Sequence, residues 1–205
     1  MKKGLLIVFS GVSGVGKGTI LSQLMPMEDL NLAYSVSMTT RKPRGIEQEG
    51  VHYYFVSHEE FQQAIDEGNM LEWAEIYANR YGTPKKPVLE KLAQGRDVIL
   101  EIEMQGAMQV KKSYPKSVLI FVLPPSISVL RKRLIDRGTE TPEQIDLRTR
   151  TTLEEIKKIK DYSYFIINDD LASAVDDALT IINAEHLRVE DEAEDIIQRY
   201  EREGI

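Results

Sequence analysis

Four short runs of apolar residues dominate the pattern along this chain of 205 residues. They are Leu5–Phe9, Val98–Leu100 with Ile102, Val118–Leu123 and Tyr164–Ile167. Unbroken apolar runs of this length are typical of strands that are buried on both faces of a parallel sheet. Between them lie stretches with helical spacing, such as the apolar positions from 171 to 182. This alternation predicts an α/β protein whose mostly parallel sheet core is flanked by helices.

A long stretch that is richer in polar residues and turn formers interrupts this rhythm at 34–83. It contains a short aromatic strand signal at Tyr53–Val56. Ser57 and Glu60 then have the spacing of a capping box, which predicts a helix that ends near Glu67. We therefore expect an insert of mixed helix and strand between two parts of the core.

A second, shorter interruption lies around 137–144. Thr141 followed by Pro142 is typical of the start of a helix, because threonine caps free N–H groups and proline fits the first position. The chain after Val189 is strongly acidic, and its few apolar residues are Ile196, Ile197 and Tyr200. That pattern predicts a surface helix of low stability.

The charge balance and the absence of cysteine narrow the function classes. With 26 basic and 33 acidic residues the net charge is −7, which argues against a general nucleic-acid binder. No cysteine is present, so disulfides and Cys-based metal sites are excluded and a cytoplasmic location is favoured. The longest apolar run is far shorter than the roughly 20 residues that cross a bilayer, so we expect no membrane span.

A glycine-rich segment directly follows the first predicted strand and precedes a predicted helix. Its sequence is Gly11-Val12-Ser13-Gly14-Val15-Gly16-Lys17. Glycines at this spacing let backbone N–H groups surround phosphate oxygens, and Lys17 adds a positive charge. The pattern predicts a phosphate-binding loop, hence an NTPase or a kinase; a flexible glycine turn is the alternative.

Position 18 departs from the general phosphate-loop pattern. It is Gly where Ser or Thr usually holds Mg²⁺, and the nearest hydroxyl belongs to Thr19. We therefore expect Mg²⁺, as the ATP cofactor, to depend on water or on another group. Glu101, at the end of the second predicted strand, is the candidate, with contact through water.

Several further blocks resemble the guanylate kinase family, in the family's order. They are Ser35–Arg44, Gly50–Phe55, Leu71–Ala74, Tyr81–Thr83, Glu101–Gly106 and Arg137–Thr141. The resemblance implies a P-loop kinase fold that phosphorylates GMP from ATP by in-line transfer with Mg²⁺. It also implies a P-loop core at 1–33 and 84–205, an inserted GMP-binding domain at 34–83, and a lid at about 137–150. It leaves open whether dGMP is also used, and the oligomeric state.

The resemblance assigns the acceptor site. It implies that GMP is bound by Ser37, Arg41, Arg44, Tyr53, Glu72, Tyr81, Thr83 and Glu103. The chemistry of these residues supports this independently. Two arginines three residues apart can grip a phosphate with fork-shaped, charge-assisted hydrogen bonds. Carboxylates are acceptors only and therefore suit the N1–H and the exocyclic amine of guanine.

The donor site is assigned in the same way. ATP binding is implied for Gly11, Val12, Ser13, Gly14, Val15, Gly16, Lys17, Gly18, Thr19 and, near the adenine, Asn168. The catalytic set is Lys17 with Arg133, Arg137 and Arg148, which would surround the transferring phosphoryl group. Positive charge at that place suits phosphoryl transfer, which depends mainly on positioning and charge neutralisation.

Other interpretations stay open at this point. Arg131–Arg133 also fits a solvated helix face, Trp73 fits core packing, and Glu72 or Glu103 could form structural ion pairs. Glu stands at 101 and 103 where the family frequently has Asp, so the contacts of both residues are undefined. Rival functions are a sugar-phosphate kinase resembling ribose-bisphosphate kinases and a non-catalytic, peptide-binding scaffold module; intact Lys17 and lid arginines speak against the second.

Overall fold

The computed structural model describes residues 3–76, 78–137, 141–189 and 193–204. Its core is a five-stranded sheet in which all neighbouring strands are parallel and the order is β2-β7-β1-β8-β9. The strands are β1 (Leu6–Gly11), β2 (Leu32–Tyr34), β7 (Asp97–Glu101), β8 (Val118–Leu123) and β9 (Tyr164–Ile167). The predicted parallel α/β core is therefore confirmed, although β1 starts one residue later than expected and continues through Gly11.

Alternate residues of β1 enter two separate apolar clusters, one on each face of the core sheet. Ile7 and Phe9 belong to a cluster with residues of α1 (Lys17–Leu24) and α7 (Leu171–Glu185). Leu6 and Val8 belong to a cluster with residues of α3 (Lys85–Ala93) and α4 (Met104–Ser113). Burial on both faces explains why this strand reads as an unbroken apolar run.

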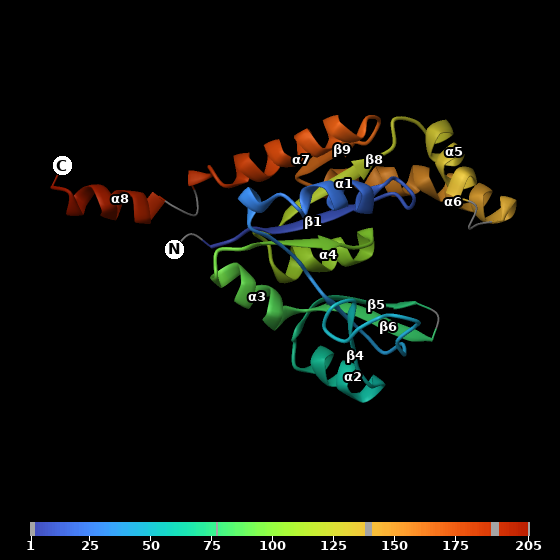
Figure 1. The fold of residues 1–205 in the computed structure, drawn as a ribbon, viewed down its shortest axis with the longest axis horizontal. Helices are drawn as coiled ribbons and strands as arrows, with labels where there is room; N and C mark the ends of the chain where they lie inside the picture. The colour runs from blue at the N-terminus through green and yellow to red at the C-terminus, as the bar shows by residue number, and fades with distance from the viewer. Residues whose placement is uncertain (1–2, 77, 138–140, 190–192, 205) are drawn as a thin grey trace.

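A second sheet of four strands lies beside the core, below it in Figure 1. Its order is β4-β3-β6-β5, and β3 pairs in parallel with β4 and antiparallel with β6. The strands are β3 (Ser37–Thr39), β4 (Tyr53–Phe55), β5 (Met70–Ile76) and β6 (Asn79–Pro84). Helix α2 (His58–Asp66) begins with both hydrogen bonds of the predicted Ser57–Glu60 capping box.

Helix α4 connects the two sheets. The side chain of Gln109 accepts a hydrogen bond from the Trp73 N–H (3.0 Å) and donates to the Trp73 carbonyl (2.8 Å). The hydroxyl of Ser113 donates to the Leu71 carbonyl at 2.8 Å. Strand β5 of the second sheet is therefore paired with a helix that packs on the core sheet.

The remaining helices lie at the ends of the molecule. Figure 1 shows α5 (Ile127–Arg137) and α6 (Pro142–Ile156) at one end, and α8 (Ala193–Arg202) apart from the rest at the other. The predicted Thr141 cap of α6 is present, with Pro142 as its first residue. Short 3₁₀ helices cover Glu28–Leu30 and Lys157–Asp161. Among the described segments, none of the helices combines the length and apolarity that a membrane span requires.

Candidate active site

The predicted phosphate loop lies between β1 and α1. Lys17 is the first residue of α1 and only 9% exposed. Its ammonium group folds back over the loop and donates to the carbonyl oxygens of Gly11 (3.2 Å) and Val12 (3.3 Å). The positive charge of Lys17 therefore lies next to the N-terminal end of α1, where unpaired N–H groups favour anions.

Two glycines in the middle of the loop cannot be replaced without strain. Gly14 and Gly16 have φ angles of 81° and 94°, a region that residues with a side chain rarely adopt. A Cβ atom on Gly16 would also lie 2.6 Å from Nδ2 of Asn168. That nitrogen donates to the Val15 carbonyl at 2.8 Å, so Asn168, directly after β9, supports the loop from the neighbouring strand end.

Two of the three predicted catalytic arginines contact the loop. Arg148 on α6 donates to the hydroxyl of Ser13 at 2.5 Å, and Arg133 on α5 donates to the Val15 carbonyl at 3.4 Å. The backbone of Arg137 ends α5, but its side chain lies outside the described residues, as do residues 138–140. Arg131, for which a solvated helix face was the alternative, forms an exposed ion pair with Asp146 at 2.7 Å.

The candidate metal-facing carboxylate lies next to the beginning of α1. Both carboxylate oxygens of Glu101 are 3.5–3.6 Å from the place where a Cβ atom on Gly18 would lie. One of these oxygens accepts a hydrogen bond of 2.6 Å from the hydroxyl of Tyr34. Thr19 is exposed, and its N–H donates to the Gly16 carbonyl as part of the first turn. The Glu101 carboxylate therefore lies in contact with the first turn of α1 at Gly18.

The predicted phosphate-gripping arginine is already paired with an anion. Arg41 forms a two-pronged ion pair with Glu47, with both N–O distances at 2.9 Å. Hydrogen bonds from Arg41 and from the Arg44 N–H lower the pKa of Glu47 to about 2. The guanidinium group of Arg41 also lies 5.4 Å from the centre of the Tyr53 ring, whose neighbour is Tyr81 at 6.1 Å between centroids. These contacts bring together the side chains of Arg41, Tyr53 and Tyr81 and the backbone N–H of Arg44.

Sequence reasoning did not single out Glu47. The available signal was an acidic residue three positions after Arg44 in the same loop, where it can reach both arginines. The side chain of Arg44 itself is exposed.

A buried carboxylate lies on the second sheet. Glu72 is 7% exposed and accepts a hydrogen bond of 2.6 Å from the hydroxyl of Thr83, its partner across β5 and β6. Burial raises the pKa of Glu72, and the Thr83 hydrogen bonds oppose that shift. A Cβ atom on Gly106 would lie 2.8 Å from the second carboxylate oxygen, so α4 approaches Glu72 this closely only because 106 is Gly. No ion pair of Glu72 occurs within the described residues, which disfavours the structural ion-pair interpretation.

Two other predicted base contacts lie at element ends. Ser37 begins β3, and exposed Glu103 is the N-cap residue of α4.

Glu155 on α6, which the sequence reasoning did not name, lies near Glu103. Burial and then the charge of Glu103 raise the pKa of Glu155, while Lys17 is among the cations that oppose the shift. Glu155 could have been predicted from helical spacing. Residues seven apart share one face of a helix, so Glu155 lies on the same face as Arg148.

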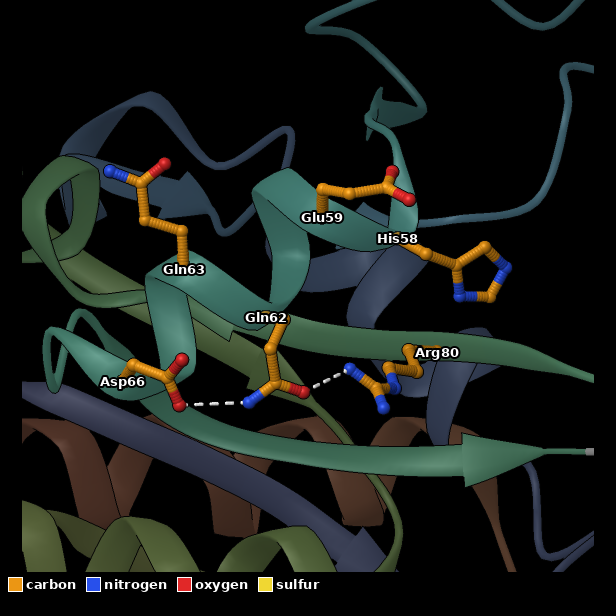
Figure 2. A pocket seen from close by; sticks show the side chains of 6 residues that line it. All are labelled: His58, Glu59, Gln62, Gln63, Asp66 and Arg80. Atoms are coloured by element: carbon orange, nitrogen blue, oxygen red, sulfur yellow. Dashed lines mark hydrogen bonds between the residues drawn. The ribbon is translucent and has the colours of Figure 1, made fainter.

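A separate open hollow of about 550 Å³ is lined by residues of α2 and by Arg80 of β6. Figure 2 shows its lining, in which Gln62 donates to Asp66 (2.8 Å) and accepts from Arg80 (2.6 Å). None of these side chains belongs to the phosphate loop or to the predicted acceptor set. The chemistry of the convergent residues, rather than the size of this hollow, therefore identifies the candidate site.

Comparison with known proteins agrees with the geometry. The sequence profile of the family described as "Guanylate kinase" matches residues 3–185. The chain is 49% identical to the guanylate kinase of Clostridioides difficile, over 99% of this chain and 98% of that protein. It is 52% identical to the guanylate kinase of Carboxydothermus hydrogenoformans, over 92% of each. A crystal structure of guanylate kinase from Anaplasma phagocytophilum is similar with a TM-score of 0.72 and 30% identity, over 96% of this chain and 95% of that one. On the strength of both the sequence and the fold, this chain belongs to the guanylate kinase family.

Proposed function

We propose that this protein transfers the terminal phosphoryl group of ATP to GMP, forming ADP and GDP. The observation that carries the proposal is the buried carboxylate of Glu72, held by Thr83 on a sheet separate from the phosphate loop. A buried acceptor that forms no ion pair with any described residue suits a neutral ligand edge with two adjacent N–H donors, which guanine has. Adenine would instead set a lone pair against it, and such mismatches can cost on the order of ten thousandfold in specificity.

The acceptor roles follow from the same contacts. Arg41, Arg44, Tyr53 and Tyr81 bind the phosphate of GMP in this proposal. The two-pronged pairing of Arg41 with a carboxylate supports it, because phosphate offers the same pair of oxygens to the same fork. Ser37 and Glu103 complete the set for the base.

On the donor side, the loop N–H groups and Lys17 hold the ATP phosphates in this proposal, and Asn168, which supports the loop through Val15, contacts the adenine. Arg133, Arg137 and Arg148 neutralise the charge that spreads over the transferring group. A phosphate oxygen of GMP bonds to the γ-phosphorus while the bond from that phosphorus to the bridging oxygen of ADP breaks. The attacking oxygen is already ionised, so the step needs no general base.

The residues present fit an Mg²⁺ ion that enters the site as a complex with ATP. The described residues contain no cluster of three potential ligands, and Mg²⁺ in kinases typically uses one or two carboxylates together with phosphates and water. Glu101, exposed beside the N-terminal end of α1, is the residue that would hold it through water. When bound, Mg²⁺ neutralises charge on the β- and γ-phosphates.

We further propose that 34–83 is a GMP-binding domain and 137–150 a lid, both of which close over the core at 1–33 and 84–205. Closure would exclude water, which competes with GMP as acceptor. GMP with a non-hydrolysable ATP analogue should therefore reduce the radius of gyration in small-angle scattering. An unchanged profile with both ligands bound would refute closure. Because ATP and GMP are cytoplasmic metabolites, the proposed reaction also places the enzyme in the cytoplasm.

The direct test is coupled ADP release with ATP and Mg²⁺, run with GMP, dGMP, AMP, CMP, UMP or no acceptor. Turnover with guanine nucleotides alone is expected. Turnover with AMP, or with no nucleotide although ATP binds, would contradict the proposal, and a sugar-phosphate acceptor would then be tested.

A further inference from the structure

The chain leaves the core sheet at Tyr34 and enters the second sheet at Ser37. The exit point is held to the core by its backbone on two sides. The Tyr34 carbonyl accepts a hydrogen bond of 2.9 Å from the ammonium group of Lys91 on α3. The next N–H, that of Ser35, donates to the Ile99 carbonyl on β7 at 3.0 Å. Any movement of the second sheet relative to the core must therefore bend the chain just after this point.

The Tyr34 side chain adds a third contact, and this one reaches the donor site. Its hydroxyl donates to Glu101 at 2.6 Å, across 67 positions of sequence. The carboxylate that accepts this bond is the one that lies next to Gly18 at the beginning of α1. One carboxylate thus lies against the phosphate-loop helix and also holds the exit point to the second sheet.

The hydroxyl of Tyr34 is the donor in this bond, since a carboxylate only accepts hydrogen bonds. Burial and the neighbouring Glu101 carboxylate raise the pKa of Tyr34 far above its ordinary value. The residue is still 40% exposed and belongs to neither apolar cluster of the core. Removing the hydroxyl would therefore remove the bond to Glu101 without opening a cavity in the core.

We propose that Tyr34 is a positioning residue that couples the ATP site to the GMP site through Glu101. The inference rests on the proposed function. In the free protein Glu101 is fixed by Tyr34, so a change in what Glu101 binds is transmitted to the exit point of the second sheet. Coupling of this kind is reciprocal: ATP changes the affinity for GMP by the same factor as GMP changes the affinity for ATP.

The test measures that factor in Tyr34→Phe. Calorimetry gives the dissociation constant of GMP with and without a saturating non-hydrolysable ATP analogue and Mg²⁺, and the converse pair of titrations checks reciprocity. Losing one hydrogen bond should reduce the coupling factor by about two- to tenfold. The affinity for each ligand alone should change by less than about twofold, because Tyr34 contacts neither in the proposed site.

Two further variants control for the chemistry. Tyr200→Phe makes the same change at an exposed tyrosine of α8 and should leave the coupling factor unchanged. Because the bond needs the carboxylate acceptor, adding Tyr34→Phe to Glu101→Ala should reduce coupling by less than Tyr34→Phe does in the unaltered protein. Thermal unfolding of each variant confirms that the fold is retained.

The two possible failures are distinguishable. Unaltered coupling in a folded Tyr34→Phe protein that binds both ligands would overturn the inference and leave the proposed function intact. Failure of the unaltered protein to bind GMP at all would overturn the proposed function, and the inference with it.

Discussion

Replacing Glu72 by Gln should move ligand affinity and protein stability in opposite directions. The side chain keeps its size and its Thr83 hydrogen bond, but it exchanges one acceptor oxygen for an N–H₂ donor. In the proposed site that donor would face the donors of guanine. A buried, unsatisfied polar pair that replaces a charge-assisted hydrogen bond costs about 3 kcal/mol, which corresponds to roughly 150-fold weaker GMP binding. Binding of an ATP analogue should be unchanged.

The free energy of unfolding, in contrast, should rise in Glu72→Gln. Burial raises the pKa of Glu72 in the folded protein, so folding becomes less favourable as pH rises from the ordinary value of about 4. The amide cannot ionise and escapes this penalty. Glu72→Gln should therefore be more stable than the unaltered protein at neutral pH, and the difference should shrink as pH falls toward 4.

The assay combines calorimetric titration with urea unfolding between pH 4 and 8. Glu75→Gln is the matched control, since Glu75 lies on the same strand with an exposed side chain and, among the described residues, a distant ion pair of 3.9 Å to Arg80. Its GMP affinity should change by less than about twofold, as is usual for exposed pairs. Equal weakening of GMP and ATP by Glu72→Gln, or equal effects of both variants, would refute the assignment of Glu72 to the base.

Three other expectations can be measured with the same protein. Lys17→Ala should lower turnover by about a thousandfold or more with an unchanged circular dichroism spectrum, because it removes the buried charge over the loop; near-normal turnover would refute the loop assignment. Asp97→Asn should lower the free energy of unfolding in urea by about 1–3 kcal/mol while kcat is preserved, because buried Asp97 accepts hydrogen bonds from the Leu5 N–H (2.8 Å) and contacts His186 (2.7 Å) far from the site. Because the pKa of Glu47 is lowered to about 2, the ionised Glu47 stabilises the fold above pH of about 4, and this contribution is lost as pH falls toward 2. Glu47→Gln should remove that part of the acid dependence of the urea midpoint. An acid profile identical to that of the unaltered protein would contradict this expectation.

The core sheet was predictable because strands that are buried on both faces have continuous apolar sequences. Strands such as β8, with five of six residues buried, read as apolar runs. In the second sheet only β4 was indicated, by the aromatic run at Tyr53–Val56. Strand β6, with the sequence NRYGTP, has no apolar alternation, and it exists because β3 and β5 pair with it on both sides. Pairing partners that are distant in sequence cannot be read from local pattern.

In the site, too, features set by local sequence were predictable, and contacts between distant residues were not. The phosphate loop was predictable because its glycine spacing is local and its geometry demands glycine. The acceptor residues were named through family resemblance, and their roles remain proposals. The contacts of Arg41 with Glu47 and of Tyr34 with Glu101 were not predicted, since each side chain is unremarkable until the fold brings its partner near.

The missing side chain of Gly106 has a further consequence. The second oxygen of Glu72 lies where even a methyl group on α4 would press against it. In the proposed role, the choice of base thus depends on the absence of one carbon atom at Gly106, a residue to which the proposed site assigns no contact with the nucleotide. A side chain at 106 would displace this acceptor, so in the proposed role a substitution there would alter guanine binding although Glu72 itself is unchanged.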